Sequence, residues 1–383
     1  MIRKITFSNY YSFKGKQKID FVAHKKRAYS YFNSKNDGQV SKIAGFIGKN
    51  ASGKTNISRL FSFLSYFVCF FNVDKNREFP YKTFFNNKEN SCFEVEFEIN
   101  DVIYFYNFTL LNNRVVKESL YFKEIGKNKK YVFEREGDSI VKFRSDIVEV
   151  TNDNKESLQN NSSFLSFINS RYKDLKYFSE VDKFFASFIG NINERGEKYT
   201  SEIEFVKYMN YFKNKELKKE VEVLLDKFDT GVKSFRVEKD KTLENVLHIY
   251  TKHNYQESEI GFKYESTGTR HLLLMLGDII LGLKNNKVII LDEIDAFLHS
   301  ELLAQLVDYF IDSNKEGRAQ LIFTVHDNSI MNYLDMHQNF IVDKTGDKSV
   351  VKRLCDIEGK RSDQNFSVKY ATGFYGSFPR VRL

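Results

Sequence analysis

The segment Gly48–Thr55 restricts the possible folds more than any other part of the chain. It reads G-K-N-A-S-G-K-T, a complete G-x-x-x-x-G-K-T phosphate loop between the apolar run Ile43–Ile47 and a helical stretch from Asn56. Such a loop lies between a buried strand and a helix, because its backbone N–H groups and the positive helix end must face phosphate oxygens. The sequence therefore predicts an α/β fold with a nucleoside triphosphate site.

Each position of the loop has an expected contact. Gly48 and Gly53 let the backbone approach phosphate, Lys54 is expected to reach the β- and γ-phosphates, and the Thr55 hydroxyl is expected in the coordination shell of Mg²⁺. A loop that binds the nucleotide does not by itself hydrolyse it, so hydrolysis needs further groups. The other predicted nucleotide contacts of this segment are Asn50, Ala51, Ser52 and Asn56.

Two acidic residues supply a candidate hydrolytic centre. The run Val288–Leu291 is a predicted buried parallel strand, and it ends in Asp292 and Glu293. We expect Asp292 to hold Mg²⁺, directly or through water, and Glu293 to orient and polarise the attacking water. The alternative is a strand that ends in two solvated acids, which is less favoured beside a complete phosphate loop.

Two further segments flank this strand. Glu265–Arg270, with the sequence E-S-T-G-T-R, opens the apolar run His271–Leu283, and His326 follows the apolar strand Gln320–Val325. Taken alone, the first is ordinary turn and helix-cap chemistry, and a lone histidine is more often structural than catalytic. Their order relative to the phosphate loop and the acidic strand is more informative than either segment.

This order of motifs resembles that of the ATP-binding-cassette (ABC) ATPases. In that family a Ser-x-Gly segment at a helix N-terminus binds the γ-phosphate held by the opposite protomer, and a switch histidine follows the next strand. The resemblance assigns Ser266 and Gly268 to this signature, His326 to the switch, and Asp295 to the D-loop aspartate at the dimer interface. It implies ATP and Mg²⁺ as ligands, hydrolysis of ATP to ADP and phosphate, and an ATP-dependent dimer or larger ring.

Two parts of the expected nucleotide site are weakly defined. Transporter-type cassettes carry a glutamine loop after the phosphate loop, but no Gln occurs between Gln39 and Gln159. No residue is assigned to that role. For the base, Phe13 and Tyr11 are candidates to stack on adenine, although either can equally belong to the core.

The ends of the chain narrow the resemblance to a soluble group of these ATPases. These are the stand-alone ATPases of abortive-infection and anti-phage operons. Ile2–Phe13 looks like their first strand and turn, and Tyr370–Pro379 is similar to their Gly-aromatic-Gly-x-x-Pro ending. RecF, SMC and OLD (overcoming-lysogenization-defect) proteins share this ATPase head. The resemblance implies a mixed or parallel central sheet, an antiparallel β subdomain and an inserted helical subdomain, without the long coiled coil of SMC proteins.

Periodicity divides the chain into five segments. Apolar and acidic residues alternate in Phe93–Ile99, which predicts a strand with one buried face, while Glu216–Leu225 carries i,i+4 charge pairs and an apolar stripe typical of a helix. The predicted segments are the first part of the ATPase lobe with the phosphate loop (1–75), an antiparallel β segment (76–150), a helical arm or lid (151–230), the signature-to-switch part of the lobe (231–345) and a C-terminal strap (346–383).

Composition limits the class of protein. The 383 residues are 42% hydrophobic and 29% charged, which is typical of a globular chain with a sizeable core. The three cysteines have no C-x-x-C spacing, so neither a disulfide framework nor a zinc site is indicated. No apolar run is long enough for a membrane span or resembles a signal peptide. We therefore expect a cytoplasmic ATPase and not a transporter subunit.

The length after the switch histidine bears on function. Fewer than 60 residues follow His326, so we expect this chain not to carry the Toprim nuclease domain of OLD proteins. Outside the ATPase motifs, no Ser/His/Asp, Cys/His or clustered-carboxylate pattern indicates that the chain itself cuts nucleic acid or protein. We therefore expect an ATPase that controls a separately encoded effector, a nuclease or toxin, in bacterial anti-phage defence.

Positive charge leaves an alternative open. The net charge is +8, which is compatible with a RecF-like DNA-binding ATPase of DNA repair, or with an acidic partner such as a phage DNA-mimic protein or tRNA. A solvated helix face explains the lysines that lie among glutamates equally well. The candidate basic segments are Lys25–Arg27, Lys127–Lys130, Lys213–Lys219 and Arg380–Arg382.

Overall fold

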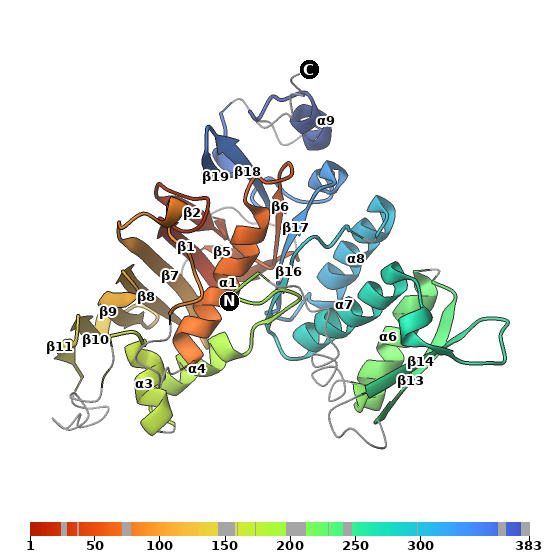
Figure 1. The fold of residues 1–383 in the computed structure, drawn as a ribbon, viewed down its shortest axis with the longest axis horizontal. Helices are drawn as coiled ribbons and strands as arrows, with labels where there is room; N and C mark the ends of the chain where they lie inside the picture. The colour runs from red at the N-terminus through yellow and green to blue at the C-terminus, as the bar shows by residue number, and fades with distance from the viewer. Residues whose placement is uncertain are drawn as a thin grey trace.

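A computed structural model gives the fold of the chain (Figure 1). It describes residues 1–23, 29–36, 38–70, 78–144, 158, 160–172, 174–196, 212–228, 230–239, 247–296, 298–358 and 365–376. Two large sheets and the helices between and beside them account for most of these residues.

The first sheet is antiparallel and has seven strands. Side chains alternate along its strands, so that Phe93 and Val95 are buried while Glu94 between them is exposed. The hairpins β7–β8 and β8–β9 turn at Asn100–Asp101 and Asn112–Asn113, where positive φ angles fit the twist of the flanking strands. Its strands, in spatial order, are β11 (Ser139–Phe143), β10 (Lys130–Glu136), β9 (Arg114–Lys123), β8 (Val102–Leu111), β7 (Ser91–Ile99), β1 (Ile2–Ser8) and β2 (Gln17–Asp20).

The second sheet has six strands and is parallel except at one edge, where β19 runs antiparallel to β18. β6, β16 and β17 are buried at every position, as expected for parallel strands covered on both faces. Its strands, in spatial order, are β12 (Ile189–Gly190), β16 (Val288–Leu291), β17 (Gln320–Val325), β6 (Ile43–Ile47), β18 (Asn339–Thr345) and β19 (Lys348–Arg353).

Helix α1 (Lys54–Cys69) fills the space between the two large sheets. Its Phe67 ring stacks on Phe108 of the antiparallel sheet with the ring centroids 4.1 Å apart. The same buried cluster includes Ile290 and Phe340 of the parallel sheet. In Figure 1, α3 (Phe164–Arg171) and α4 (Phe178–Ala186) cover α1 at the antiparallel end.

The opposite face of the parallel sheet is covered by a second set of elements. A separate buried cluster joins β6 and β16 to α7, α8 and α6, which lie to the right in Figure 1. A small sheet, β13 to β15, packs beside α6. These elements are α6 (Lys215–Lys227), α7 (Thr267–Lys284), α8 (Ser300–Ser313), β13 (Val232–Lys239), β14 (Leu247–His253) and β15 (Ile260–Gly261).

The remaining elements are short. A further small sheet has the order β3-β5-β4, and the described residues also include the short helix α9 and 3-10 segments in different parts of the chain. They are β3 (Val22–Ala23), β4 (Tyr31–Asn33), β5 (Gln39–Ser41), α9 (Phe366–Ala371), η1 (Phe84–Asn86), η3 (Phe262–Tyr264), η4 (Asn328–Asn332) and η5 (Leu354–Asp356).

The predicted fold class is confirmed: a mixed, mainly parallel sheet, an antiparallel sheet and helices inserted between them. The sheets do not follow the order of the predicted segments, because β1 and β2 from the first segment pair with β7 and complete the antiparallel sheet. Within 151–230, the described part packs on α1 and α7 and adds β12 to the parallel sheet. The five segment boundaries stay a prediction.

No helix in the described ranges is long and apolar enough to cross a membrane. Among the same residues, no group of three or more His, Cys, Asp and Glu side chains is arranged to hold a metal ion. The three cysteines, Cys69, Cys92 and Cys355, are not joined by disulfides.

Candidate functional site

Three loops meet at one edge of the parallel sheet. β16, β17 and β6 are consecutive parallel neighbours, so their carboxyl ends lie at the same edge (Figure 1). The phosphate loop follows β6, Asp292 and Glu293 follow β16, and His326 follows β17. The topology therefore brings motifs far apart in sequence into one site.

Packing explains the two glycines of the phosphate loop. A Cβ atom on Gly48 would lie 2.3 Å from the Val342 carbonyl oxygen, so no side chain fits there. Gly53 has a φ of 113° and precedes the first residue of α1, a conformation that glycine adopts without strain. The first N–H groups of α1 have no intrahelical acceptor, which makes this loop suitable for an anion.

Lys54 is enclosed by the loop that it follows. Its Nζ donates to the carbonyls of Gly48 (2.6 Å) and Lys49 (3.1 Å) and lies 3.3 Å from Nδ1 of His326. Burial lowers the pKa of Lys54, while the carboxylates across the site oppose that shift. The Ser52 hydroxyl is also buried, and within the described part of the chain it has no hydrogen-bond partner. Bound phosphate oxygens would fit these groups.

Asp292 is buried and held from three elements. Its Oδ1 accepts hydrogen bonds from Ser58 Oγ of α1 (2.9 Å) and from Thr324 Oγ1 of β17 (2.8 Å). Its backbone exchanges two hydrogen bonds with the Asn191 side chain, at 2.7 and 2.9 Å. The carboxylate is therefore fixed next to the start of α1, where a metal ion bound to Thr55 would lie.

Glu293 stands in an unusual backbone conformation. Its φ is 49°, in the left-handed region that non-glycine residues rarely adopt. Its N–H donates to Thr324 Oγ1 (2.8 Å), and its Oε1 lies 3.3 Å from Nε2 of His326. One imidazole therefore lies between the buried ammonium of Lys54 and the half-exposed carboxylate of Glu293.

Asp295 holds the loop that carries His326. Its Oδ2 accepts from the N–H groups of His326 and Asp327, both at 2.7 Å. Its Oδ1 is buried without a hydrogen-bond partner among the described residues. In this structure Asp295 thus fixes the switch loop of its own chain.

The signature segment lies on a separate helix end. Ser266 is the exposed N-cap of α7, and its Oγ accepts from the N–H of Thr269 (3.1 Å), with Gly268 in the first turn. Among the described residues, neither Ser266 nor Gly268 forms a hydrogen bond to the phosphate loop. The structure brings together the predicted residues Gly48, Ser52, Gly53, Lys54, Thr55, Asp292, Glu293, Asp295 and His326 and leaves Ser266 and Gly268 apart.

The other predicted contacts differ in accessibility. Asn50 and Ala51 are exposed at the tip of the loop, while Asn56 is half-buried and donates from Nδ2 to Ser12 Oγ (2.9 Å). Phe13 is fully buried and packs on Phe7, so it is wrong as a base-stacking candidate. Half-buried Tyr11 remains a candidate, with the Arg59 guanidinium 5.0 Å from its ring centroid.

Sequence reasoning missed Ser58, Asn191 and Thr324. Ser58 lies one helical turn after Lys54, so the i,i+4 spacing on α1 could have indicated it. Thr324 is a hydroxyl residue that interrupts the apolar run from Leu321, two positions before His326, which is a weaker signal. No sequence signal connects Asn191 with Asp292, which is 101 positions away.

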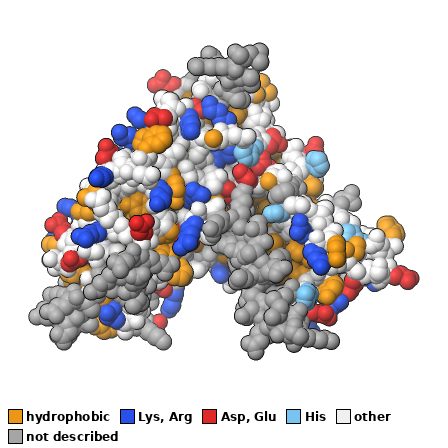
Figure 2. Space-filling model, in the orientation of Figure 1, with side chains coloured by type: hydrophobic (Ala, Val, Ile, Leu, Met, Phe, Trp, Pro, Cys, Tyr) orange, Lys and Arg blue, Asp and Glu red, His pale blue; other side chains and the backbone are white. Residues whose placement is uncertain are grey.

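Several lysines of the basic segments contact acidic or aromatic side chains among the described residues. Lys127 pairs with Glu124 (2.6 Å), Lys129 lies over an aromatic ring, and Lys218 pairs with Glu222 (3.5 Å). Figure 2 shows Lys and Arg side chains dispersed among acidic ones on this face. Lys25–Arg27 and Arg380–Arg382 lie outside the described residues.

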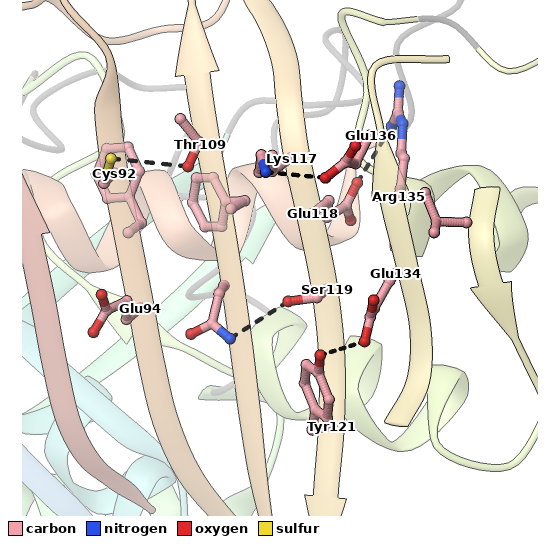
Figure 3. Close-up of a pocket in the computed structure, with 14 residues that line it drawn as sticks. Cys92, Glu94, Thr109, Lys117, Glu118, Ser119, Tyr121, Glu134, Arg135 and Glu136 are labelled. Carbon is pink, nitrogen blue, oxygen red and sulfur yellow. Dashed lines mark hydrogen bonds and ion pairs between the residues drawn. The ribbon is translucent and has the colours of Figure 1, made fainter. Parts of the chain in front are cut away.

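A pocket of about 520 Å³ lies on the antiparallel sheet and is lined by residues of β7 to β11 (Figure 3). Its polar side chains mostly pair with one another across strands. Tyr121 bonds Glu134, and Lys117 lies 2.9 Å from Glu136. None of the predicted nucleotide-site residues lines it.

Solved structures similar in fold to this chain include SMC head domains. The SMC head domain from Thermotoga maritima is 14% identical, with a TM-score of 0.44, and the alignment covers 92% of this chain and 98% of that chain. An SMC head bound to the C-winged helix domain of ScpA is also 14% identical, with a TM-score of 0.49 and coverage of 92% and 96%. Comparison with curated protein sequences finds no significant match.

Comparison with protein-family models identifies the family of this chain. The family described as "AAA domain, putative AbiEii toxin, Type IV TA system" matches residues 43–332, which extend from the strand before the phosphate loop to beyond the switch histidine. This range is most of the chain and contains the phosphate loop, the signature segment, the acidic pair and His326. The chain therefore belongs to this family of ABC-type AAA ATPase domains related to abortive infection.

Proposed function

We propose that this protein hydrolyses ATP to ADP and phosphate in a Mg²⁺-dependent reaction. The observation that carries the proposal is the continuous contact from Lys54 through His326 to Glu293, beside the buried carboxylate of Asp292. Phosphoryl transfer depends on positioning and charge stabilisation, and these groups supply both at one sheet edge.

Each group has a proposed task. Lys54 and the loop N–H groups hold the β- and γ-phosphates, and Thr55 with Asp292 holds Mg²⁺. Bound Mg²⁺ would neutralise phosphate charge. The carboxylate of Glu293 is half-exposed, so water can reach it, and it orients and polarises the attacking water. His326 contacts the γ-phosphate and aligns Glu293, which lies 3.3 Å from its Nε2.

A second copy of the chain completes the site. Ser266 and Gly268 lie at an exposed helix end apart from their own phosphate loop, and we propose that they bind the γ-phosphate held by the partner copy. Asp295 lies at the same interface. ATP then strengthens self-association into a dimer or larger ring, and hydrolysis weakens it by removing the bridging phosphate.

The biological role that we propose is control of a separately encoded effector, a nuclease or toxin, in cytoplasmic anti-phage defence. The family description, which names abortive infection and toxin–antitoxin systems, supports this role. Closing and opening of an ATP-bridged assembly would switch the effector between held and released states.

Substitution of Glu293 tests the enzymatic part. Glu293→Gln should lower kcat roughly 10²- to 10³-fold, because it removes the group that polarises water, while ATP affinity changes little. Glu301→Gln, an exposed carboxylate at the start of α8, is the matched control. Steady-state phosphate release and titration with a fluorescent ATP analogue measure the two quantities. Equal kcat in Glu293→Gln and wild type would refute the assigned role.

Native mass spectrometry tests the assembly. Glu293→Gln protein is expressed with its flanking genes and measured with and without ATP, and Lys54→Ala serves as the non-binding counterpart. We expect ATP to produce a complex of at least two copies with a neighbouring gene product. A protein that stays monomeric with ATP contradicts the composite site, and a homodimer that gains only DNA would favour the repair function instead.

A further inference from the structure

A buried carboxylate stands directly before the exposed signature cap. Glu265 is 9% exposed, whereas the next residue, Ser266, is exposed at the start of α7. The proposed phosphate chemistry has no use for Glu265. A buried carboxylate is unfavourable unless it is paired and hydrogen-bonded, so its partners indicate why it can stand there.

Both partners of Glu265 come from β14. The Thr251 hydroxyl donates to Oε1 of Glu265, and Nε2 of His253 lies 2.6 Å from the same oxygen. Residues two apart on a strand share a face, so one face of β14 holds the carboxylate. The N–H of Glu265 donates to the Phe262 carbonyl (3.1 Å) in the turn before α7.

The imidazole of His253 lies close to Gly231, the residue before β13. Gly231 has a φ of 73°, and a Cβ atom placed on it would lie 3.3 Å from Nδ1 of His253. The Gly231 carbonyl accepts from the N–H of Asn254 (2.8 Å). The small sheet is therefore joined to the start of α7 through His253 and Glu265.

We propose that Glu265 is a positioning residue, clamped by His253 and Thr251, that holds the Ser266 cap in the orientation needed to bind the partner copy's γ-phosphate. The pairing also turns the negative charge of Glu265 toward the sheet and away from the incoming phosphate. The small sheet thereby sets the strength of ATP-dependent self-association without touching the nucleotide of its own chain. This inference rests on the proposed function.

The test separates binding within one chain from association between chains. All variants are made in Glu293→Gln protein, so that ATP is not consumed. Affinity for a fluorescent ATP analogue in dilute protein reports the phosphate loop, and sedimentation velocity with saturating ATP at several protein concentrations reports the dimer. Thermal melts show that each variant is folded.

His253→Phe keeps an aromatic ring at this position but removes the hydrogen-bond donor to Glu265. The dissociation constant of the ATP-dependent dimer should rise about tenfold or more, because a buried hydrogen bond to a charged group is lost. The affinity of this variant for the ATP analogue should stay unchanged. His253→Gln, which retains an N–H donor, should restore association to within about threefold. Thr251→Val, which removes the hydroxyl, should weaken association in the same way, and Thr251→Ser, which keeps the hydroxyl, should restore it. The control is His248→Phe, at an exposed position on β14.

The outcomes are distinct. Loss of association in His253→Phe with rescue by His253→Gln supports the clamp. Unchanged association in folded His253→Phe, or equal loss of ATP affinity and association, overturns it. If the Glu293→Gln parent stays monomeric with ATP, the proposed function fails first and the clamp falls with it.

Discussion

The charged side chains of the two large sheets differ in how far they are buried and paired. In the antiparallel sheet, Glu118 and Arg135 are both fully buried and paired at 3.2 Å. Glu118 also accepts from Tyr106 Oη (2.8 Å) and from the N–H of Phe164 (2.7 Å), the first residue of α3. Burial raises the pKa of Glu118 although Arg135 opposes the shift. This network is closed, because its groups use their bonding capacity on one another.

At the edge of the parallel sheet the network is open. Lys54 is buried, but Glu293 and His326 keep 32% and 39% of their side chains exposed. Glu293 also retains a left-handed backbone, a strain that surrounding structure must support. A closed charged network stabilises a fold, whereas an open one with strain at its end is suited to binding and chemistry.

Breaking the closed network should give the largest effect. Glu118→Ala leaves Arg135 buried without its carboxylate and removes the acceptor of the first N–H group of α3, so we expect a loss of about 4 kcal/mol in the free energy of unfolding. Urea denaturation measures it. Lys117→Ala, which breaks an exposed pair on the same strand, should change stability by about 0.5 kcal/mol or less. Similar urea midpoints for the two variants would contradict the distinction.

Breaking the open network should affect ligand binding more than folding. Lys54→Ala should weaken ATP binding about a hundredfold, or about 3 kcal/mol, because truncating one partner of a buried charge contact has effects of this size. Lys49→Ala, a half-buried lysine in the same loop with its Nζ 3.8 Å from Asp343, is the control. Isothermal titration calorimetry measures both. Equal affinities in the two variants would remove Lys54 from the site.

The smallest effect should come from a residue that supports the open network from behind. Ser58→Ala removes one of the two hydroxyls on Oδ1 of Asp292, and we expect the Mg²⁺ concentration for half-maximal ATPase activity to rise about fivefold, near 1 kcal/mol. Ser62→Ala, one turn further along α1 with a bond to the Ile192 carbonyl, is the control. A lower kcat at saturating Mg²⁺ with an unchanged half-saturation point would instead assign Ser58 to water positioning.

The sequence allowed much of the open site to be predicted and little of the closed network. The phosphate loop, the acidic pair and His326 each follow a buried strand, and short-range pattern is sufficient to find them. Glu118 and Arg135 carry no such pattern, because their burial depends on cross-strand pairing of β9 with β10 and on α3 docking over them. The sequence also left open whether Phe13 stacks on the base or belongs to the core, because its packing on Phe7 depends on the fold.

By itself, the sequence of this protein determined local features: which strands end in polar loops, that a helix follows the phosphate loop, and that this loop needs its glycines. These depend on steric limits and hydrogen bonds within a few residues. Only the tertiary structure decided that β1 completes the antiparallel sheet, that Asn191 clamps Asp292, and that Glu265 is buried against β14. Such contacts join residues that are distant in sequence, so they follow from strand order and side-chain packing.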